Sequence, residues 1–172
     1  MKIQTVGELF LIGLQYAYDG EKQLTEALPK MAEMSSNPEL KQAFEKHLTE
    51  TKEHVRRAEH IFKACDVEPE AKPNAILKQM VQEAEKMISS TDKGPLRDAA
   101  LIVAGNQVEH FEMATYGSLR SFAQLLNKSD VVSVLEKTLQ EEKQADAKLT
   151  EVGEQYVNVQ AMHQSEAAIG AR

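Results

Sequence analysis

The chain has 172 residues, which is enough for one domain with a full hydrophobic core. Charged residues make up 27% of it, aromatic residues only 5%, and tryptophan is absent, a composition typical of an amphipathic all-helical protein. The 27 acidic and 20 basic residues give a net charge of -7. This charge repels the phosphate backbone of nucleic acids, so we expect no nucleic-acid partner.

The sequence leads us to expect no membrane-spanning or export segment. No stretch approaches the roughly 18 consecutive apolar residues of a transmembrane helix. The N-terminus leads directly into a helix start instead of a charged and then apolar signal peptide. We therefore expect a cytoplasmic protein that does not bind membranes. The single cysteine, Cys65, has no partner for a disulfide, and we expect it to be a small buried side chain near a helix end.

The first half of the chain predicts an antiparallel pair of long helices. The first helix begins at a capping box, Thr5 to Glu8, and extends to about Met34. A tight turn ending in Asn37 then starts a second helix, which covers about residues 38 to 65. So short a turn forces the two helices to run side by side in opposite directions.

The second half predicts a similar pair after a long connection. The connection contains a shorter amphipathic helix over residues 74 to 89. A third long helix follows from residue 95 to about 126, and a fourth from about 129 to Tyr156. Two helical hairpins joined by a long crossover that contains a short fifth helix predict an all-α, ferritin-like four-helix bundle.

The predicted bundle ends at residue 156. Residues 157 to 172 are small and polar and have no sustained apolar stripe. We therefore predict one ferritin-like domain over residues 1 to 156 and a flexible C-terminal tail over residues 157 to 172.

Polar side chains interrupt the core-facing stripe of every long helix near its middle. In the first, third and fourth helices, apolar residues recur every three or four positions. The exceptions to this repeat are Glu21, Glu112, Glu142 and Asp146. In the second helix, His47, Glu50 and His54 fall on or beside the equivalent stripe. Several ionised carboxylates are buried together only where they are protonated or share cations, so the pattern predicts two divalent metal ions inside the bundle.

The spacing of these residues favours chelation. Glu50 and His54 are one helical turn apart on one face, as are Glu142 and Asp146. The usual carboxylate-bridged pattern is a glutamate from each of two helices and Glu-x-x-His from each of the other two. Here the spacing is one residue longer, and the second histidine is replaced by aspartate. This donor set suits iron or manganese, and the sequence leaves the choice open.

Two further residues have alternative interpretations. Glu109 lies one turn before Glu112 and is either an additional ligand or a solvated surface acid. We expect His47 to be a core or supporting histidine and not a ligand. Tyr116 is expected to be a packing residue with a polar end.

Five segments of the chain carry a family resemblance: AYDGEKQL, HLTETKEH, RDAALI, VEHFEMATYGSL and LEKTLQEEKQAD. Together they resemble the YciF/YciE-like bacterial stress protein family, over about residues 1 to 155. The resemblance implies a fold related to rubrerythrin and ferritin, a homodimer, and a link to stress. It also implies a metal site made of Glu21, Glu50, His54, Glu109, Glu112, Glu142 and Asp146.

Two functions are consistent with these features. The first is a stress-response protein whose two metal ions, iron or manganese, act on oxygen or peroxide, which would make it an oxidoreductase. The second is a non-enzymatic homodimeric scaffold or binding protein whose site is structural or vacant. Apolar residues on the predicted crossover helix, which one bundle does not cover fully, also favour a homodimer.

Overall fold

The computed structural model describes the backbone of residues 2–170 and the side chains of residues 2–164. Within this part of the chain all regular structure is helical. The elements, in chain order, are α1 (Val6–Met34), α2 (Pro38–Ala64), α3 (Ala75–Ser89), α4 (Pro95–Leu125), α5 (Ser129–Val152), the π-helical turn η1 (Gly153–Val157) and α6 (Asn158–Gly170).

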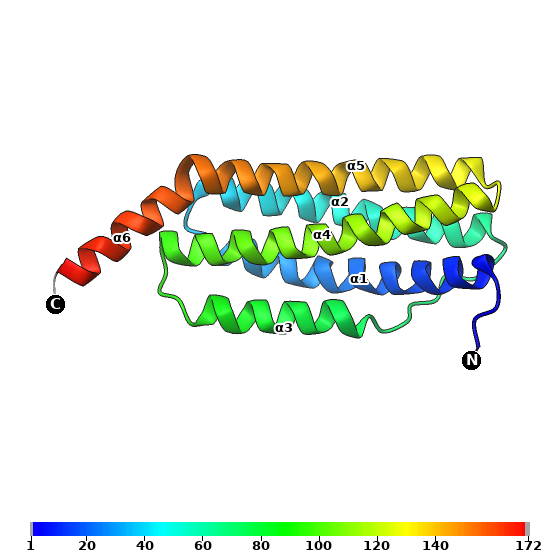
Figure 1. Ribbon diagram of the computed structural model, residues 1–172, viewed down its shortest axis with the longest axis horizontal. Helices are drawn as coiled ribbons and strands as arrows, with labels where there is room; N and C mark the ends of the chain where they lie inside the picture. Colours follow the sequence, from blue (N-terminus) through cyan, green and yellow to red (C-terminus); the bar gives the residue numbers. More distant parts are fainter. Residues whose placement is uncertain (1, 171–172) are drawn as a thin grey trace.

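The four long helices form two antiparallel hairpins, α1 with α2 and α4 with α5, packed side by side (Figure 1). Helix α3 lies along the bundle against α1 and α4, and α5 lies on the opposite side (Figure 1). This arrangement confirms the predicted ferritin-like bundle with a short fifth helix in the crossover. None of the described helices has an apolar stretch long enough to cross a bilayer.

Local side-chain chemistry sets the helix starts. The Thr5 hydroxyl accepts a hydrogen bond from the Glu8 backbone N–H, and the Glu8 carboxylate accepts one from the Thr5 N–H, so the predicted capping box is present. The Asn37 side chain caps α2 by accepting hydrogen bonds from the backbone N–H groups of Glu39 and Leu40. The buried carboxylate of Asp98 on α4 accepts hydrogen bonds from the backbone N–H groups of Ser36 and Asn37, at 2.7 and 2.8 Å. Asp98 therefore fastens the first hairpin turn to the second hairpin.

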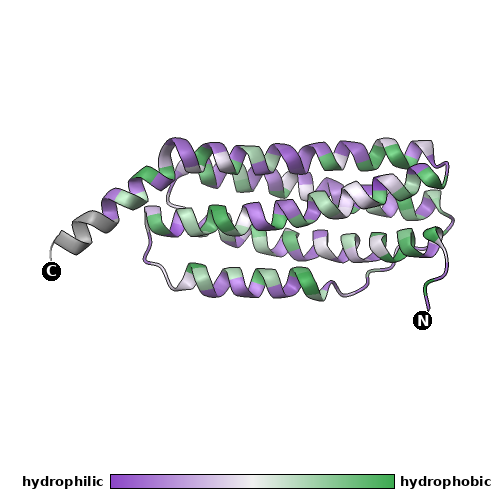
Figure 2. Ribbon diagram, viewed as in Figure 1, coloured by the Kyte–Doolittle hydropathy of each residue, from purple (hydrophilic) through white to green (hydrophobic). Residues whose placement is uncertain are grey.

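The hydrophobic core is divided into two clusters along the bundle axis. One cluster contains Phe10, Leu14, Tyr18, Ile61, Phe62, Tyr116, Leu119, Leu135 and Leu139. The other contains Leu24, Leu28, Leu40, Phe44, Leu77, Ile88, Leu101, Leu149 and Val152. On α1, Glu21 lies between the two clusters, and on α5 Glu142 does so. Apolar residues alternate with polar ones along the helices (Figure 2). The core is thus interrupted by a polar layer near its middle.

The segment that we predicted as a C-terminal tail, from residue 157, is helical through residue 170. The backbone continues through η1 into α6, where the sequence indicated no regular structure. Val157 and Ala161 are buried because this segment packs against α4. Two apolar contacts of this kind are too few to form a recognisable stripe in the sequence. The domain boundary at residue 156 stays a prediction, and residues 171–172 lie outside the described residues.

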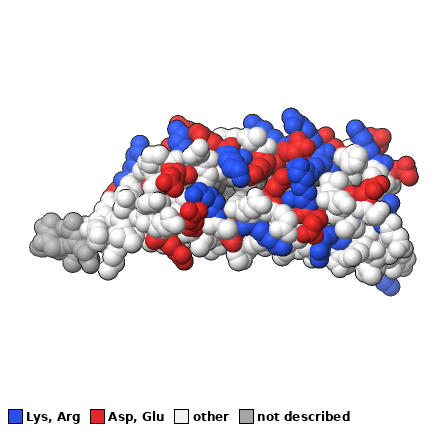
Figure 3. Space-filling view, turned by 90° about the horizontal axis from the view of Figure 1, so that it is seen from above, with Lys and Arg blue, Asp and Glu red and all other residues white. Residues whose placement is uncertain are grey.

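The surface carries both charges in close mixture. On the face seen from the α5 side, lysine and arginine side chains alternate with aspartate and glutamate, and neither sign forms a large patch (Figure 3). Alternating charges of this kind keep a helical bundle solvated.

Candidate metal centre

Helices α1 and α5 each place one fully buried glutamate in the polar layer. Glu21 and Glu142 both have 0% of their surface exposed. Glu21 lies one turn after Ala17 and one turn before Leu24, so it shares the apolar face of α1. Glu142 follows Leu139 on the core face of α5 in the same manner. Both carboxylates point inward because the helix face that carries them is the one packed in the bundle.

Helix α2 contributes two buried histidines. His47 and His54 are seven residues apart, which is close to two full turns, so their rings lie on the same face. The ring centroids are 6.4 Å apart. Thr51, between them, is buried and its hydroxyl donates to the His47 carbonyl oxygen at 2.9 Å, so it competes with neither ring.

Helix α4 contributes two buried glutamates one turn apart, Glu109 and Glu112. One turn earlier, Gly105 lets α4 approach α5 closely, since a Cβ atom there would lie 2.6 Å from Cδ1 of Leu149. The glycine therefore helps to bring the α4 carboxylates near the residues of α5.

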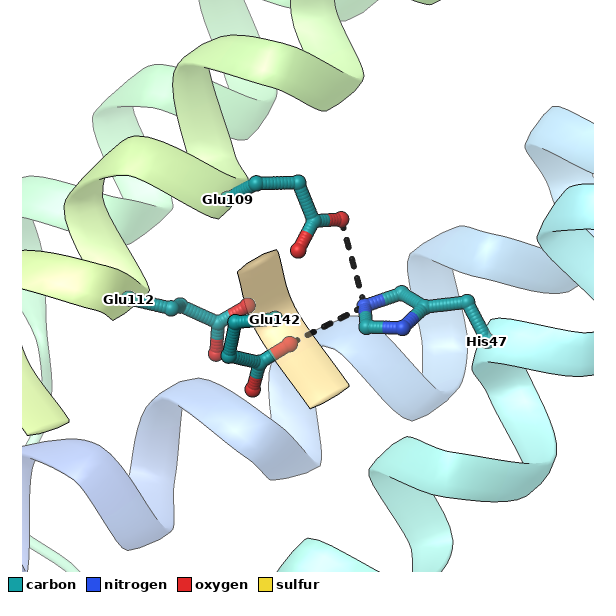
Figure 4. A group of neighbouring side chains, drawn as sticks. All are labelled: His47, Glu109, Glu112 and Glu142. Carbon is teal, nitrogen blue, oxygen red and sulfur yellow. Dashed lines mark ion pairs between the residues drawn. The ribbon is translucent and has the colours of Figure 1, made fainter. Parts of the chain in front are cut away.

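These side chains form two groups that could each hold a metal ion. The first contains His47, Glu109, Glu112 and Glu142, which converge on one point from three helices (Figure 4). The second contains Glu21, His54 and Glu142. Within each group, one ligand atom from every residue lies within 4.8 Å of the others. Glu142 belongs to both groups, so its two oxygens can serve adjacent ions, as bridging carboxylates do in two-metal sites.

The histidines lie within ion-pair distance of the carboxylates. His47 Nε2 is 3.2 Å from Glu109 Oε1 and 3.7 Å from Glu142 Oε2. His54 Nδ1 is 3.1 Å from Glu142 Oε1 and 3.4 Å from Glu21 Oε1. The Tyr116 hydroxyl donates a hydrogen bond to Glu21 Oε1, so this tyrosine has a contact with the site in addition to its packing role.

Burial makes the carboxylates difficult to ionise in the metal-free protein. Burial, with Glu142 nearby, raises the pKa of Glu109 to about 8. Burial and the neighbouring Glu21 and Glu142 carboxylates raise the pKa of Glu112 well above its ordinary value. Burial also raises the pKa of Glu21. A divalent cation would reverse these shifts, because it stabilises the ionised form.

The histidine pKa values move upward for a different reason. Burial disfavours the charged ring of His47, but the carboxylates of Glu109, Glu50 and Glu142 outweigh it and raise the pKa to about 9. For His54, the nearby carboxylates of Glu142 and Glu21 likewise outweigh burial and raise the pKa to about 11. In the metal-free protein, two protonated histidines thus supply the positive charge that metal ions would bring.

Many polar atoms of the site have no hydrogen bond. They are Glu21 Oε2, both ring nitrogens of His47, His54 Nδ1, Glu109 Oε2, Glu112 Oε2 and both carboxylate oxygens of Glu142. An unpaired buried polar atom is costly, and such atoms are rare in folded proteins. Here they face one another, so a shared cation would satisfy many of them together. The residues present therefore fit a metal ion.

The donor set limits the kind of metal. The two groups together comprise four glutamates and two histidines. Four ionised carboxylates balance the charge of two divalent ions, so the loaded centre would be close to neutral. Carboxylate oxygen with imidazole nitrogen and no thiolate suits iron or manganese. The total matches the usual carboxylate-bridged centre, but both histidines come from α2.

The structure brings together five of the seven residues predicted from the sequence: Glu21, His54, Glu109, Glu112 and Glu142. The other two lie outside both groups. Glu50 is about one-fifth exposed and pairs with Lys46 at 2.9 Å. The His47 ring, whose Nδ1 lies 3.7 Å from Glu50 Oε2, and Lys46 lower the pKa of the Glu50 carboxyl to about 2. Asp146 is equally exposed and lies 3.2 Å from His110 Nε2.

Helix geometry explains this difference. Glu50 is about 60° around α2 from His47, because three residues turn the helix by about 300°. It therefore lies at the edge of the core face and reaches toward solvent. Asp146 is one turn after Glu142, but its carboxylate lies beside His110 and outside both ligand groups. Ligation by Glu50 or Asp146 stays a prediction that this geometry does not favour.

His47 was expected to be a supporting residue, and the structure places it in the four-residue group instead. The sequence contained a signal for it. A separation of seven residues from His54 aligns the two rings more closely than the four-residue spacing of Glu50 and His54 does. The seven-residue spacing therefore predicts that both histidine rings lie on the same core-facing side of the helix.

Glu141 holds the His54 ring in position. His54 Nε2 lies 2.9 Å from Glu141 Oε2, and Arg57 binds both oxygens of Glu141. Burial opposes ionisation of Glu141, but the hydrogen bonds from Arg57 and His54 outweigh it and lower the pKa. An ionised Glu141 accepts the hydrogen of Nε2. The Nδ1 lone pair is then available to a metal ion beside Glu21 and Glu142.

Replacing Glu141 with glutamine is expected to weaken metal binding by about 10- to 100-fold, the usual effect of losing the acceptor behind a ligating histidine. A glutamine amide can donate to Nε2, which moves the ring hydrogen to Nδ1, where a metal ion would bind. Calorimetric titration with manganese(II) measures the affinity, and Glu53→Gln on the exposed face of α2 is the matched control. Equal affinities for both variants would show that Glu141 does not orient His54.

The fold and site define a ferritin-like helical bundle with buried histidine and glutamate groups at its centre. The chain belongs to the family described as a domain of unknown function, DUF892, whose model matches residues 5–162. It is similar to the protein YciF of Escherichia coli strain K12, with 38% identity over 162 residues that cover 94% of this chain and 98% of the relative. The family resemblance seen in the sequence is thereby confirmed.

Solved structures agree with this membership. The crystal structure of the E. coli stress protein YciF matches with a TM-score of 0.86 and 38% identity, over 91% of this chain and 99% of that one. The Rhodopseudomonas palustris protein YcfI, described as structural, matches with a TM-score of 0.84 and 36% identity, over 87% and 95%. A Xanthomonas campestris protein has the same fold, with a TM-score of 0.72 and 24% identity over 95% and 99%.

Proposed function

We propose that this protein is a stress-response protein that holds two divalent iron or manganese ions in its core and uses them on oxygen or peroxide. The observation that carries the proposal is the sharing of Glu142 between two buried ligand groups whose facing atoms lack other partners. Two adjacent ions of this kind supply two-electron chemistry when bound. The assignment to stress rests on the relatives, since E. coli YciF is named a stress protein.

The residues of the chain have separate roles in this proposal. His47, Glu109 and Glu112 hold one ion, and Glu21 and His54 hold the other. The Tyr116 hydroxyl fixes the orientation of the Glu21 carboxylate through its hydrogen bond. The apolar clusters on both sides exclude bulk water, which strengthens every electrostatic contact in the layer.

Anaerobic loading with iron(II), followed by oxygen or hydrogen peroxide, tests this function. We expect two ions per chain, and oxidation of bound iron(II) faster than that of free iron(II) in the same buffer. Glu142→Gln should show neither effect. If the wild-type protein binds two ions but oxidises them no faster than buffer does, the centre is structural.

A structural centre is the second candidate function. The related protein YcfI is described as structural, and a metal ion that stabilises the folded bundle would suit a scaffold. In that case metal raises the melting temperature without consumption of either reactant. The iron(II) experiment separates the two candidates because it measures binding and turnover in one sample.

We also propose that the protein is a homodimer. Helix α3 covers one half of the face made by α1 and α4, and a groove of about 390 Å³ lies over the other half. Leu9, Tyr16 and Ile76 border this groove, and Ile76 is 65% exposed. An apolar surface of this kind is typical of an interface between copies. Light scattering at micromolar concentration should return a dimer for the wild-type protein and a monomer for Ile76→Lys, and a monomeric wild type would contradict the proposal.

A further inference from the structure

A cavity of about 40 Å³ lies beneath α3, between this helix and the bundle. Its walls come from α1, α2, α3 and α4 and are apolar, with Leu24, Leu28, Phe44, Val81, Ile88 and Val108 among them. At its inner end it reaches His47 and Glu109, which belong to the four-residue ligand group. The cavity therefore connects the underside of α3 with one of the two candidate metal positions.

Polar groups occur only at the two ends of this cavity. Lys30 and Glu85 stand at the outer end, where their exposed side chains form an ion pair at 3.6 Å. His47 and Glu109 stand at the inner end. Between them, no residue of the lining offers a polar side chain. A molecule held between the ends finds no hydrogen-bond partner among the wall side chains, so the site favours apolar molecules.

The size of the cavity selects small molecules. A volume of about 10 to 15 Å³ holds one water-sized molecule, so this cavity has room for about three. An organic substrate would not fit, whereas a diatomic gas would. Dioxygen is apolar and needs no hydrogen bonds, but hydrogen peroxide loses those it makes with water.

A second approach to the same ligands is polar. A cavity of about 30 Å³ on the α5 side also reaches His47 and Glu109. Lys46, Glu50 and Lys148 line it, together with Gln144 and the apolar residues Ala43, Phe44, Ala145 and Leu149. Charged side chains of both signs suit ions and hydrated reactants. The two approaches differ in chemistry although they end at the same residues.

We propose that the cavity beneath α3 binds a small apolar molecule of the size of dioxygen and leads it to the His47 and Glu109 end of the site. Hydrogen peroxide and metal ions use the polar approach on the α5 side. The route for dioxygen rests on the proposed function, because dioxygen is a reactant only if the bound metal ions react with it. The cavity as a binding site for apolar molecules does not depend on a metal.

Xenon tests the binding site in the metal-free protein, because this apolar atom enters dry cavities and is located by anomalous diffraction. We expect a xenon atom beneath α3 in pressurised wild-type crystals. Ala84→Leu and Ala27→Leu each fill the cavity from a half-buried position, so the xenon atom should be absent from both variants. Ala114→Leu makes the same change at an exposed position of α4 and should leave xenon in place. Absence of xenon from the wild-type cavity would overturn the proposal.

Kinetics test the route. In iron(II)-loaded protein, Ala84→Leu should slow oxidation by dioxygen several-fold and leave oxidation by hydrogen peroxide unchanged, relative to Ala114→Leu. Equal slowing of both reactants, or of neither, would overturn the route. If the wild-type protein binds no iron, the proposed function fails, and the xenon result still decides whether the cavity is an apolar binding site.

Discussion

Replacing Glu142 with glutamine is expected to abolish the thermal stabilisation that manganese(II) or iron(II) gives the wild-type protein. Glu142 is the one residue shared by both ligand groups, so its loss removes a donor from each. A ligand at 100 times its dissociation constant stabilises the folded state by about 2.7 kcal/mol. For a domain of this size, that corresponds to a rise of roughly 5–10 °C in melting temperature.

Scanning calorimetry with increasing metal concentration measures this effect. Glu136→Gln is the matched control, because it makes the same change at a half-buried position of α5 outside the polar layer, whose partly exposed ion pair with Arg120 contributes little. The control should retain the full wild-type response. A wild-type melting temperature that ignores both metals, or a Glu142→Gln variant that still responds fully, would exclude a shared carboxylate.

Opposite pH dependences are expected for the metal-free and metal-loaded protein. In the metal-free fold, the pKa of His47 is raised from 6.5 to about 9, and that of His54 from 6.5 to about 11. The stability these groups contribute is fully present below pH 6.5 and is lost as the pH rises through the folded-state pKa values. The pKa of Glu109 is raised from 4.5 to about 8, so its contribution to stability is also lost as the pH rises, between these two values. The metal-free melting temperature should therefore fall between pH 6.5 and pH 9.

Bound metal reverses the direction in which stability changes with pH, because ligating imidazoles and carboxylates must be deprotonated. Binding should release protons, and affinity should rise over the same pH range. Melting curves at pH 6.5 and pH 9, with and without manganese(II), check both directions in one experiment. A metal-free melting temperature that is constant or rises over this range would show that the histidines are not held protonated by the glutamates.

The long helices could be predicted from the sequence, because the local capping signals and the spacing of core residues agree in them. The capping box at Thr5 and the cap at Asn37 placed helix starts that the structure reproduces. The helix after residue 157 was not indicated by the sequence, because Val157 and Ala161 pack it against α4 and it has no apolar stripe of its own. The contact of Asp98 with the first hairpin turn depends on tertiary placement, so no sequence pattern indicated it.

The candidate site was less predictable than the fold. A helical stripe gives the direction of a side chain to within about one residue, or about 100°. This was enough to collect Glu21, Glu112 and Glu142, which replace core residues directly. This precision is too low to predict whether a residue at the edge of the stripe faces the core or the solvent. In the structure, Glu50 points toward Lys46 and the solvent, whereas His47 is buried and points into the bundle.

Anomalous diffraction from crystals soaked in manganese(II) tests the central claim most directly. We predict two peaks in each chain. One should lie among His47, Glu109, Glu112 and Glu142, and the other among Glu21, His54 and Glu142, with Glu142 in contact with both. No peak in the polar layer, or a single peak bound by Glu50 and Asp146, would contradict the account.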